Sequence, residues 1–158
     1  MGNNFTITVV AGNAKTGNEN INLAIEEIRR IEKLFTTYKE DSQTNLINQN
    51  AGIEPVKVDQ EVFNLIERAT GISKITQGAF DISYGSLDKS LWNFDKTMTS
   101  LPNPQTAKKM IHLIDYRNII LDKQNCTVFL KEKGMRIGFG GIGKGYAAEM
   151  AKQVLLKN

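Results

Sequence analysis

The sequence predicts an α+β fold in which helices pack on a mostly antiparallel sheet. Two long stretches carry apolar residues at helical spacing, and an alternating, β-branched run opens the chain. Short β-branched runs near the carboxyl end are separated by tight turns, which predicts antiparallel neighbours. The 158 residues suffice for a core of ordinary size, and no linker or repeat divides them. We therefore expect a single domain over residues 1–158.

The first part of the chain is expected to contain one strand and one long helix. Phe5–Val10 alternates apolar and polar residues and predicts the strand, and the polar stretch Gly12–Asn20 predicts a loop. From Ile21 to about Tyr38, apolar residues recur with helical periodicity behind Asn20, an expected N-cap. Residues 36–48 are polar, so we expect a surface loop with a short helix.

A second strand and helix are expected in the middle of the chain. Val56–Val58 is a minimal strand, and Asp59 is placed to cap a helix over Gln60–Thr76. Gly78 suits the C-terminal cap of that helix, because glycine enters the left-handed conformation without steric cost. Further on, Trp92 is most simply a core anchor, with stacking on a ligand as the alternative.

The last part predicts a helix, a meander and a second helix. Asn103–Leu113 carries Pro104 in its first turn, and its His112 is expected to be packed or half-exposed rather than to act as a base. Three strands in a meander then follow, over residues 118–121, 127–131 and 135–139. Tyr146–Leu156 has an apolar face and predicts the final helix.

Composition excludes several classes of function. The net charge of +3 is small and the lysines are scattered, so no nucleic-acid-binding surface is indicated. The single cysteine, Cys126, cannot form an internal disulfide, and one histidine beside it cannot build a His/Cys zinc site. Any metal would therefore be a hard cation bound by oxygen ligands. No apolar run is long enough to span a membrane, and no secretory signal precedes the first strand.

The most informative stretch is glycine-rich and joins the strand over 135–139 to the final helix. Residues 136–146 read RIGFGGIGKGY. Glycines let backbone N–H groups approach a ligand closely, a helix N-terminus favours a phosphate, and Lys144 adds a full positive charge. We therefore interpret this stretch as a phosphate or pyrophosphate cradle; the alternative is a plain strand-to-helix turn with Lys144 in solvent.

Two familiar fingerprints overlap in this stretch, and neither fits. Gly138, Gly140 and Gly143 spell the GxGxxG of dinucleotide-binding folds, but too few residues follow for the next strand and its acidic residue. Gly138, Gly143 and Lys144 spell most of a P-loop, but Gly145 stands where that motif requires Ser or Thr. The cradle, if present, is therefore of another kind.

A second candidate is Asp81, which lies between Phe80 and Ile82 in an otherwise apolar run. Burial of an unpaired carboxylate is costly, so this side chain must either be hydrogen-bonded or face a ligand. The sequence leaves both possibilities open.

Three separated stretches together resemble the ApbE family, the FAD:protein FMN transferases. They are the opening strand with Tyr38, Ser42 and Asn48, the GAFDI run over residues 78–82, and the GGIGKGY run over residues 140–146. The resemblance runs along the whole chain, covers roughly the first half of a family member, and implies a T-fold-like architecture. The segment that completes the magnesium site of the family belongs to the other half.

The resemblance also implies which residues bind FAD. Tyr38 matches an aromatic residue that lines the flavin pocket, where a ring can stack on a flat heterocycle. Gly138 falls where many members have an aspartate that contacts FAD, and Gly141 matches the position whose backbone carbonyl binds Mg²⁺. The cofactor-binding residues implied in this way are Met1, Tyr38, Ala79, Phe80, Asp81, Gly138 and Lys144.

The family implies a Mg²⁺-dependent phosphoryl transfer. A threonine hydroxyl of an acceptor flavoprotein attacks the FMN-side phosphorus of FAD and AMP leaves, while Mg²⁺ and the glycine loop offset charge on the pyrophosphate. Two alternatives remain open: a hydrolase that passes FAD to water, giving FMN and AMP, and a non-catalytic flavin-binding or structural fragment. The resemblance assigns no catalytic residue.

Location and assembly are the last expectations. Family members are generally exported and lipid-anchored, so we expect the extracytoplasmic face of the membrane or the periplasm, although the chain shows no signal peptide and Cys126 is internal. We expect the apolar face of Tyr146–Leu156 to be short of partners, which predicts that the chain self-associates or depends on the family's other half.

Overall fold

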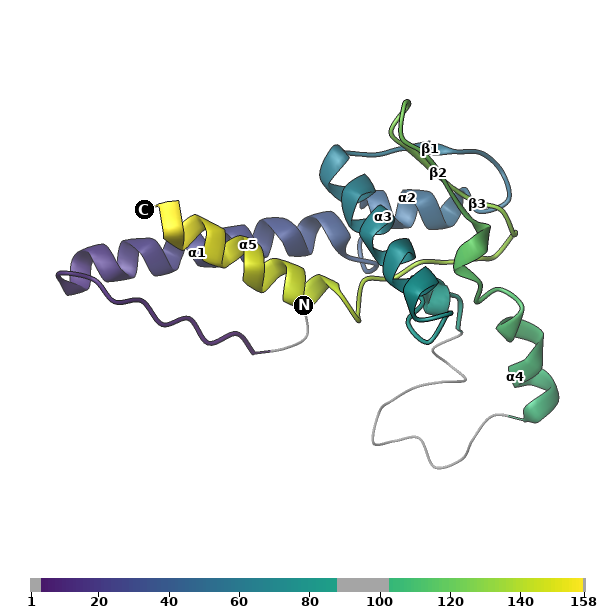
Figure 1. Cartoon of the computed structure of the whole chain (residues 1–158), viewed down its shortest axis with the longest axis horizontal. Coiled ribbons are helices and arrows are strands. Elements are labelled where there is room, and N and C mark those ends of the chain that lie inside the picture. The colour runs from purple at the N-terminus through teal and green to yellow at the C-terminus, as the bar shows by residue number, and fades with distance from the viewer. Residues whose placement is uncertain (1–3, 88–102, 158) are drawn as a thin grey trace.

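The computed structural model describes residues 4–87 and 103–157 and confirms the α+β fold (Figure 1). In chain order the elements are α1 (Ala14–Phe35), α2 (Gln43–Gln49), β1 (Val56–Lys57), α3 (Gln60–Ile75), the 3₁₀ helix η1 (Ile82–Ser86), α4 (Pro104–Ile111), the 3₁₀ helix η2 (Tyr116–Asn118), β2 (Ile119–Asp122), β3 (Thr127–Leu130) and α5 (Gly143–Lys157). None of the described helices is both long and apolar enough to cross a membrane.

The sheet is antiparallel with strand order β1-β3-β2, and its register pairs Val56 with Val128 and Ile119 with Leu130. The predicted turn between β2 and β3 is confirmed. Within it, the Asp122 carboxylate accepts hydrogen bonds from the backbone N–H groups of Gln124 and Asn125. α3 supplies the centre of the core. Its Val62, Phe63 and Ile66 are fully buried, as are Val128 and Leu130 of the sheet.

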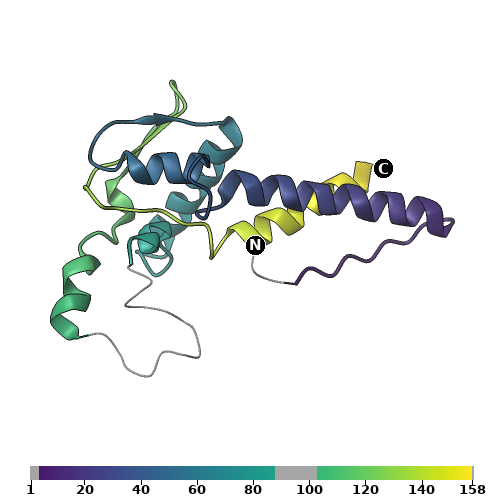
Figure 2. The ribbon, with the colours of Figure 1, turned by 180° about the vertical axis from the view of Figure 1, so that it is seen from behind.

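The molecule has two parts, a body and an arm. The body holds the sheet with α2 and α3, and the arm is formed by α1 and α5, which lie side by side (Figures 1 and 2). Ala24 and Ile31 of α1 and Ala147 and Ala151 of α5 are buried in the arm. The expectation that the apolar face of the last helix would lack partners is therefore wrong, because α1 covers it.

Both arm helices begin earlier than predicted. α1 starts at Ala14 behind Asn13, whose side chain accepts a hydrogen bond from the Thr16 N–H at 3.0 Å, so the expected loop over 12–20 and the Asn20 cap are wrong. This first stretch lies mostly in solvent and so carries no apolar periodicity for a sequence pattern to show. α5 starts at Gly143 rather than Tyr146.

Two predicted strands are extended but join no sheet within the described residues. Residues 5–10 alternate half-buried and exposed side chains as a strand would, yet their backbone groups pair with no other strand; Figure 2 shows the segment running back along α1. Residues 135–139 are also extended, but their backbone groups are bound by the side chains of Asn48 and Ser86 and by backbone groups of loops and helices rather than by a strand. An alternating sequence pattern indicates an extended, half-buried backbone. A strand also requires hydrogen bonds to a neighbouring strand, which the local sequence does not specify.

The remaining predictions hold in part. Asp59 occupies the N-cap of α3 as expected, but its side chain makes no cap hydrogen bond; the Asp59 N–H instead donates to Gln43 at 2.7 Å. Gly78 follows α3 with φ at 86° and donates to the Ser73 carbonyl at 2.8 Å, which closes the helix end. His112 is exposed at the end of α4, so the expectation that it would be packed or half-exposed is wrong. Trp92 and its neighbours lie outside the described residues.

Candidate functional site

One cleft of about 1340 Å³ gathers the predicted site residues. It lies between the end of α1 with the loop after it, the GAFD segment with η1, and the glycine loop that leads into α5. The predicted residues that line it are Tyr38, Ala79, Phe80, Asp81, Gly138, Gly141 and Lys144. Met1 lies outside the described residues. Segments far apart in the sequence thus meet at a single concave surface.

The floor of the cleft is the extended segment 136–138, and side chains hold it in place. Asn48 is buried on α2 and binds both backbone groups of Ile137: its amide accepts from the Ile137 N–H at 2.7 Å and donates to the Ile137 carbonyl at 3.1 Å. The Ser86 hydroxyl accepts from the Arg136 N–H at 2.9 Å, and the Gly138 N–H donates to the Ile82 carbonyl at 2.9 Å. Nothing in the local sequence marks Ser86 for this role.

Two glycines permit close backbone contact at this floor. A side chain on Gly85 would place its Cβ 2.8 Å from the Ile137 carbonyl carbon, and one on Gly141 would come within 3.1 Å of the Phe80 ring. The GAFD segment and the glycine loop therefore pack directly on one another. A larger residue at Gly85 would force the backbone of η1 and of the floor segment apart, and one at Gly141 would require the Phe80 ring to shift by a few tenths of an ångström.

The glycine loop ends in hydrogen-bond donors that the protein does not use. The N–H groups of Ile142 and Gly143 both donate to the Phe139 carbonyl, at 3.1 and 2.6 Å. Within the described residues, the N–H groups of Lys144 and Gly145 in the first turn of α5 have no acceptor. The Lys144 side chain is exposed at the cleft. Free N–H groups, a helix N-terminus and an ammonium group together suit an anion such as a phosphate.

Asp81 is hydrogen-bonded, which answers the question its burial raised. One carboxylate oxygen accepts from the Ser83 N–H at 2.8 Å and from the Ser83 hydroxyl at 2.6 Å, and the other accepts from the Tyr116 N–H at 2.8 Å. The side chain therefore caps η1 and ties it to the start of η2. Its visible role is to shape the GAFD wall of the cleft.

Aromatic side chains stand at the mouth of the cleft. Tyr38 is 88% exposed, and Tyr84, a cleft residue that the sequence analysis did not single out, is 46% exposed. The loop that carries Tyr38 is fixed from α2: the Ser42 hydroxyl donates to the Thr36 carbonyl at 2.6 Å, and the Asn45 amide donates to the Thr37 carbonyl at 2.9 Å. Aromatic rings at these two positions offer flat surfaces to a planar ligand.

A polar network links the first turn of α5 to the other helices. The Tyr146 hydroxyl donates to Glu61 of α3 at 2.8 Å, and Arg30 of α1 donates to both Glu61 oxygens at 2.7 and 2.9 Å and also to Glu27. The hydrogen bonds from Arg30 hold the pKa of Glu61 below its ordinary value, despite partial burial. Burial and the Glu61 contact raise the pKa of Tyr146 to about 12. Glu61 is thus ionised and Tyr146 protonated at neutral pH.

The described residues offer little to a metal ion. No group of three or more His, Cys, Asp or Glu among them could hold one. Gly141 lines the cleft, so its carbonyl is available there, but no acidic cluster accompanies it. Mg²⁺ takes six oxygen ligands, many of them water or substrate phosphate. The part of the chain that the structure describes therefore does not complete a magnesium site.

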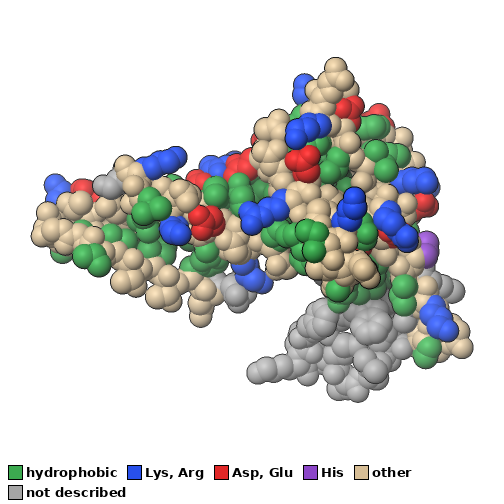
Figure 3. Space-filling model, viewed as in Figure 1, with side chains coloured by type: hydrophobic (Ala, Val, Ile, Leu, Met, Phe, Trp, Pro, Cys, Tyr) green, Lys and Arg blue, Asp and Glu red, His purple; other side chains and the backbone are tan. Residues whose placement is uncertain are grey.

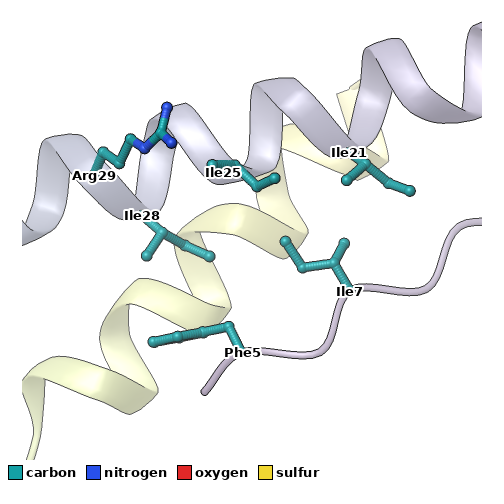
Figure 4. A pocket seen from close by; sticks show the side chains of 6 residues that line it. All are labelled: Phe5, Ile7, Ile21, Ile25, Ile28 and Arg29. Carbon is teal, nitrogen blue, oxygen red and sulfur yellow. The ribbon is translucent and has the colours of Figure 1, made fainter. Parts of the chain in front are cut away.

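A second, smaller groove lies on the arm and contains none of the predicted site residues. Its volume is about 360 Å³, and it is lined by Phe5, Ile7, Ile21, Ile25, Ile28 and Arg29. Figure 4 shows Phe5 and Ile7 of the extended segment facing the isoleucines of α1. The groove is apolar apart from Arg29, whose guanidinium group is paired with Glu26. On the face shown in Figure 3, acidic and basic side chains are interspersed over both arm and body.

Sequence comparisons relate the chain to one protein family. The ApbE family profile matches residues 1–158. The FAD:protein FMN transferase of Klebsiella pneumoniae (strain 342) is 36% identical over 128 residues, which cover 81% of this chain and 40% of that protein. The enzyme of the same name from Treponema pallidum (strain Nichols) is 29% identical over 144 residues, covering 85% and 40%. The chain thus spans about 40% of the length of these curated relatives.

Solved structures agree with this placement. The ApbE protein of Thermotoga maritima matches with a TM-score of 0.80 at 31% identity, over 89% of this chain and 45% of that one. The flavin transferase ApbE from Vibrio cholerae shares the fold, with a TM-score of 0.75 at 21% identity, over 92% and 46%. The match along the full length of the chain and the likeness of the folds lead to one conclusion: the chain belongs to the ApbE family.

Proposed function

We propose that this chain forms the FAD-binding part of an FAD:protein FMN transferase. The observation that carries the proposal is the meeting, in one cleft, of the Lys144 N–H at the start of α5, which has no acceptor among the described residues, the Lys144 ammonium and the aromatic mouth. The first two suit the FAD pyrophosphate, and Tyr38 and Tyr84 suit its planar rings. The names of the relatives support the same ligand and the transfer of FMN to a protein.

The reaction we propose is a phosphoryl transfer to a threonine of a flavoprotein acceptor. The threonine oxygen forms a new bond to the FMN-side phosphorus, the bond from that phosphorus to the bridging oxygen breaks, and AMP leaves with that oxygen. The threonine proton passes to solvent or to a base outside the described residues. Lys144 and the N–H groups of Lys144 and Gly145 offset the negative charge that grows on the phosphate oxygens.

Mg²⁺ remains part of the proposal on the strength of the family resemblance. A bound Mg²⁺ would supply positive charge beside the pyrophosphate, and Gly141 would contribute its carbonyl. The described residues supply no further ligand cluster, so no step is assigned to the metal.

We also propose an extracytoplasmic location, again from the resemblance. Its test is to express the natural gene with a reporter fused to this chain and to find on which side of the membrane the reporter is active.

The first experiment titrates the chain with FAD and follows flavin fluorescence and AMP release together, with Mg²⁺ or with EDTA. Lys144→Ala is expected to weaken FAD binding about tenfold or more, because a charge-assisted contact to phosphate is lost. Lys131→Ala is the matched control, since Lys131 is equally exposed but does not line the cleft. Equal affinity of both variants would contradict the assignment of the cleft.

The products separate the candidate functions. FMN attached to a threonine of an added flavoprotein, together with AMP, identifies a transferase. Free FMN and AMP without acceptor modification identify a hydrolase that uses water. FAD binding without AMP identifies a flavin-binding fragment, and no binding at all would make the chain a structural remnant. The exposed, water-accessible cleft mouth is the observation that keeps the hydrolase as the second candidate.

A further inference from the structure

The first turn of α5 is built from residues that hold a helix poorly. Gly143 and Gly145 flank Lys144, and Gly140 and Gly141 precede them. Glycine loses more backbone freedom on folding than any other residue and is, after proline, the weakest helix former. The free N–H groups and Lys144 lie in this turn, so the part of the cleft that suits a phosphate is also the part that would fray without support.

The support comes from Tyr146, the first large side chain after these glycines. Its ring meets Phe35 edge-on at a centroid distance of 5.7 Å, and Phe35 in turn lies 4.7 Å from the ring of Phe139 at the start of the glycine loop. Its hydroxyl donates to Glu61 at 2.8 Å. Both ends of the glycine loop are thus joined to the carboxyl end of α1 through one aromatic contact chain.

Glu61 is itself fixed, which makes it an effective anchor. Arg30 donates two hydrogen bonds to Glu61 and two more to Glu27, so the guanidinium group is held in plane between two carboxylates. A carboxylate that accepts two hydrogen bonds from one guanidinium group has few rotamers left. It therefore presents its oxygen to Tyr146 at a constant position. The network connects α1, α3 and α5, three elements that are distant in sequence.

We propose that Tyr146 is a positioning residue for the phosphate cradle: its hydrogen bond to the Arg30-clamped Glu61 fixes the first turn of α5 and with it Lys144 and the free N–H groups. The identity of the ligand rests on the proposed function. The positioning itself does not, because it is a property of the chain without ligand. A role in general stability alone would act on the whole fold, whereas this role acts first on residues 140–145.

The experiment compares Tyr146→Phe with Tyr116→Phe. Tyr116 is also half-buried against the core, and its hydroxyl has no hydrogen-bond partner within the described residues. Amide order parameters of Gly140, Gly141, Gly143 and Gly145 are measured by ¹⁵N relaxation in the free protein, beside urea midpoints and FAD affinity. In Tyr146→Phe we expect these order parameters to fall from about 0.85 toward about 0.6. We expect them to be unchanged in Tyr116→Phe.

Two further variants keep the test decisive if Tyr146→Phe is poorly folded. Glu61→Ala removes the acceptor and should loosen the glycines in the same way, and Glu61→Gln keeps a side-chain carbonyl that can accept from Tyr146 and should restore their order. Unchanged glycine order parameters in both Tyr146→Phe and Glu61→Ala would overturn the inference.

The measurement of FAD affinity separates this inference from the proposed function. If the unmodified chain binds FAD, we expect Tyr146→Phe to raise the Kd several-fold while its urea midpoint stays within the shift seen for Tyr116→Phe; an unchanged Kd would overturn the inference. If the unmodified chain binds no FAD, the proposed function fails, and the order parameters alone decide whether Tyr146 positions the turn.

Discussion

At the scale of single residues, Gly138 stands where the family resemblance implies an aspartate in many members. Among the described residues, a Cβ added at this position would meet only the Gly85 Cα, at 3.9 Å, which is an ordinary van der Waals contact. Gly85 itself has no such room, because a Cβ there would lie 2.8 Å from the Ile137 carbonyl carbon. Two glycines in contact across the cleft floor therefore have opposite tolerance for a side chain.

We expect Gly138→Asp to fold with an unchanged urea midpoint and, if the cleft binds FAD as proposed, to change its affinity for FAD in fluorescence titration. Gly85→Ala should lower the free energy of unfolding by about 1–3 kcal/mol, because the backbone of one wall must shift. A Gly138→Asp variant less stable than Gly85→Ala would show that the cleft floor has been described incorrectly.

The Tyr146–Glu61 pair predicts a dependence of stability on pH. The Tyr146 pKa is raised from 10.0 to about 12 in the folded chain, so its contribution is fully present below about pH 10 and is lost as pH rises toward 12. The Glu61 pKa is lowered from 4.5, so its contribution is present above that value and is lost as pH falls through its folded pKa.

Urea unfolding of the unmodified chain and of Tyr146→Phe at a series of pH values tests the predicted loss of stability at alkaline pH. The difference between their midpoints should be constant from about pH 6 to 9 and should shrink above pH 10. A difference that stays constant up to pH 12 would mean that the phenol does not donate to Glu61.

At the scale of elements, the sequence predicted the long helices, the hairpin and the glycine loop, and it failed where an element depends on a distant partner. Residues 135–139 have a strand-like pattern, but their neighbours are the side chains of Asn48 and Ser86 rather than a strand. Asn48 lies on a polar stretch that looks like a surface loop, and its burial comes from contacts that local sequence does not encode. Lys144 and Asp81 were singled out from the local sequence, and the other cleft residues were predicted from the family resemblance. Tyr84 and Ser86 were missed because nothing local marks them.

The packing of α5 on α1 leads to a prediction with a built-in control. Ala147 is fully buried in the arm, whereas its neighbour Ala148 is exposed. Ala147→Leu should lower the free energy of unfolding by about 1–3 kcal/mol, because added methylenes separate the two helices. Ala148→Leu should change it by no more than about 0.5 kcal/mol. Thermal or urea unfolding of the two variants measures both, and equal effects would contradict the pairing of α1 with α5.

At the scale of the whole molecule, the extended segment over residues 4–11 is notable because its backbone hydrogen-bonding groups are unpaired within the described residues. Its backbone pairs with no strand in the described residues, and Val10 is 99% exposed. Unpaired extended segments with apolar side chains favour association with other chains. Self-association therefore stays a prediction. Its basis is now the exposed first segment, because the last helix is covered by α1.

Light scattering after gel filtration, over a range of concentrations, tests this expectation. We expect a mass above that of one chain that rises with concentration, and Ile7→Lys should reduce it by placing a charge in the apolar groove of the arm. A compact monomer at every concentration would contradict the expectation.

The arm joins the beginning of the chain to its end, and this has a consequence for how the protein folds. α1 packs mainly on α5, and every other described element lies between them in sequence. During synthesis, α1 leaves the ribosome long before its partner exists, and docking must close a loop that contains nearly the whole chain. The body can form from nearer contacts, so we expect the arm, and with it the finished phosphate cradle, to form last.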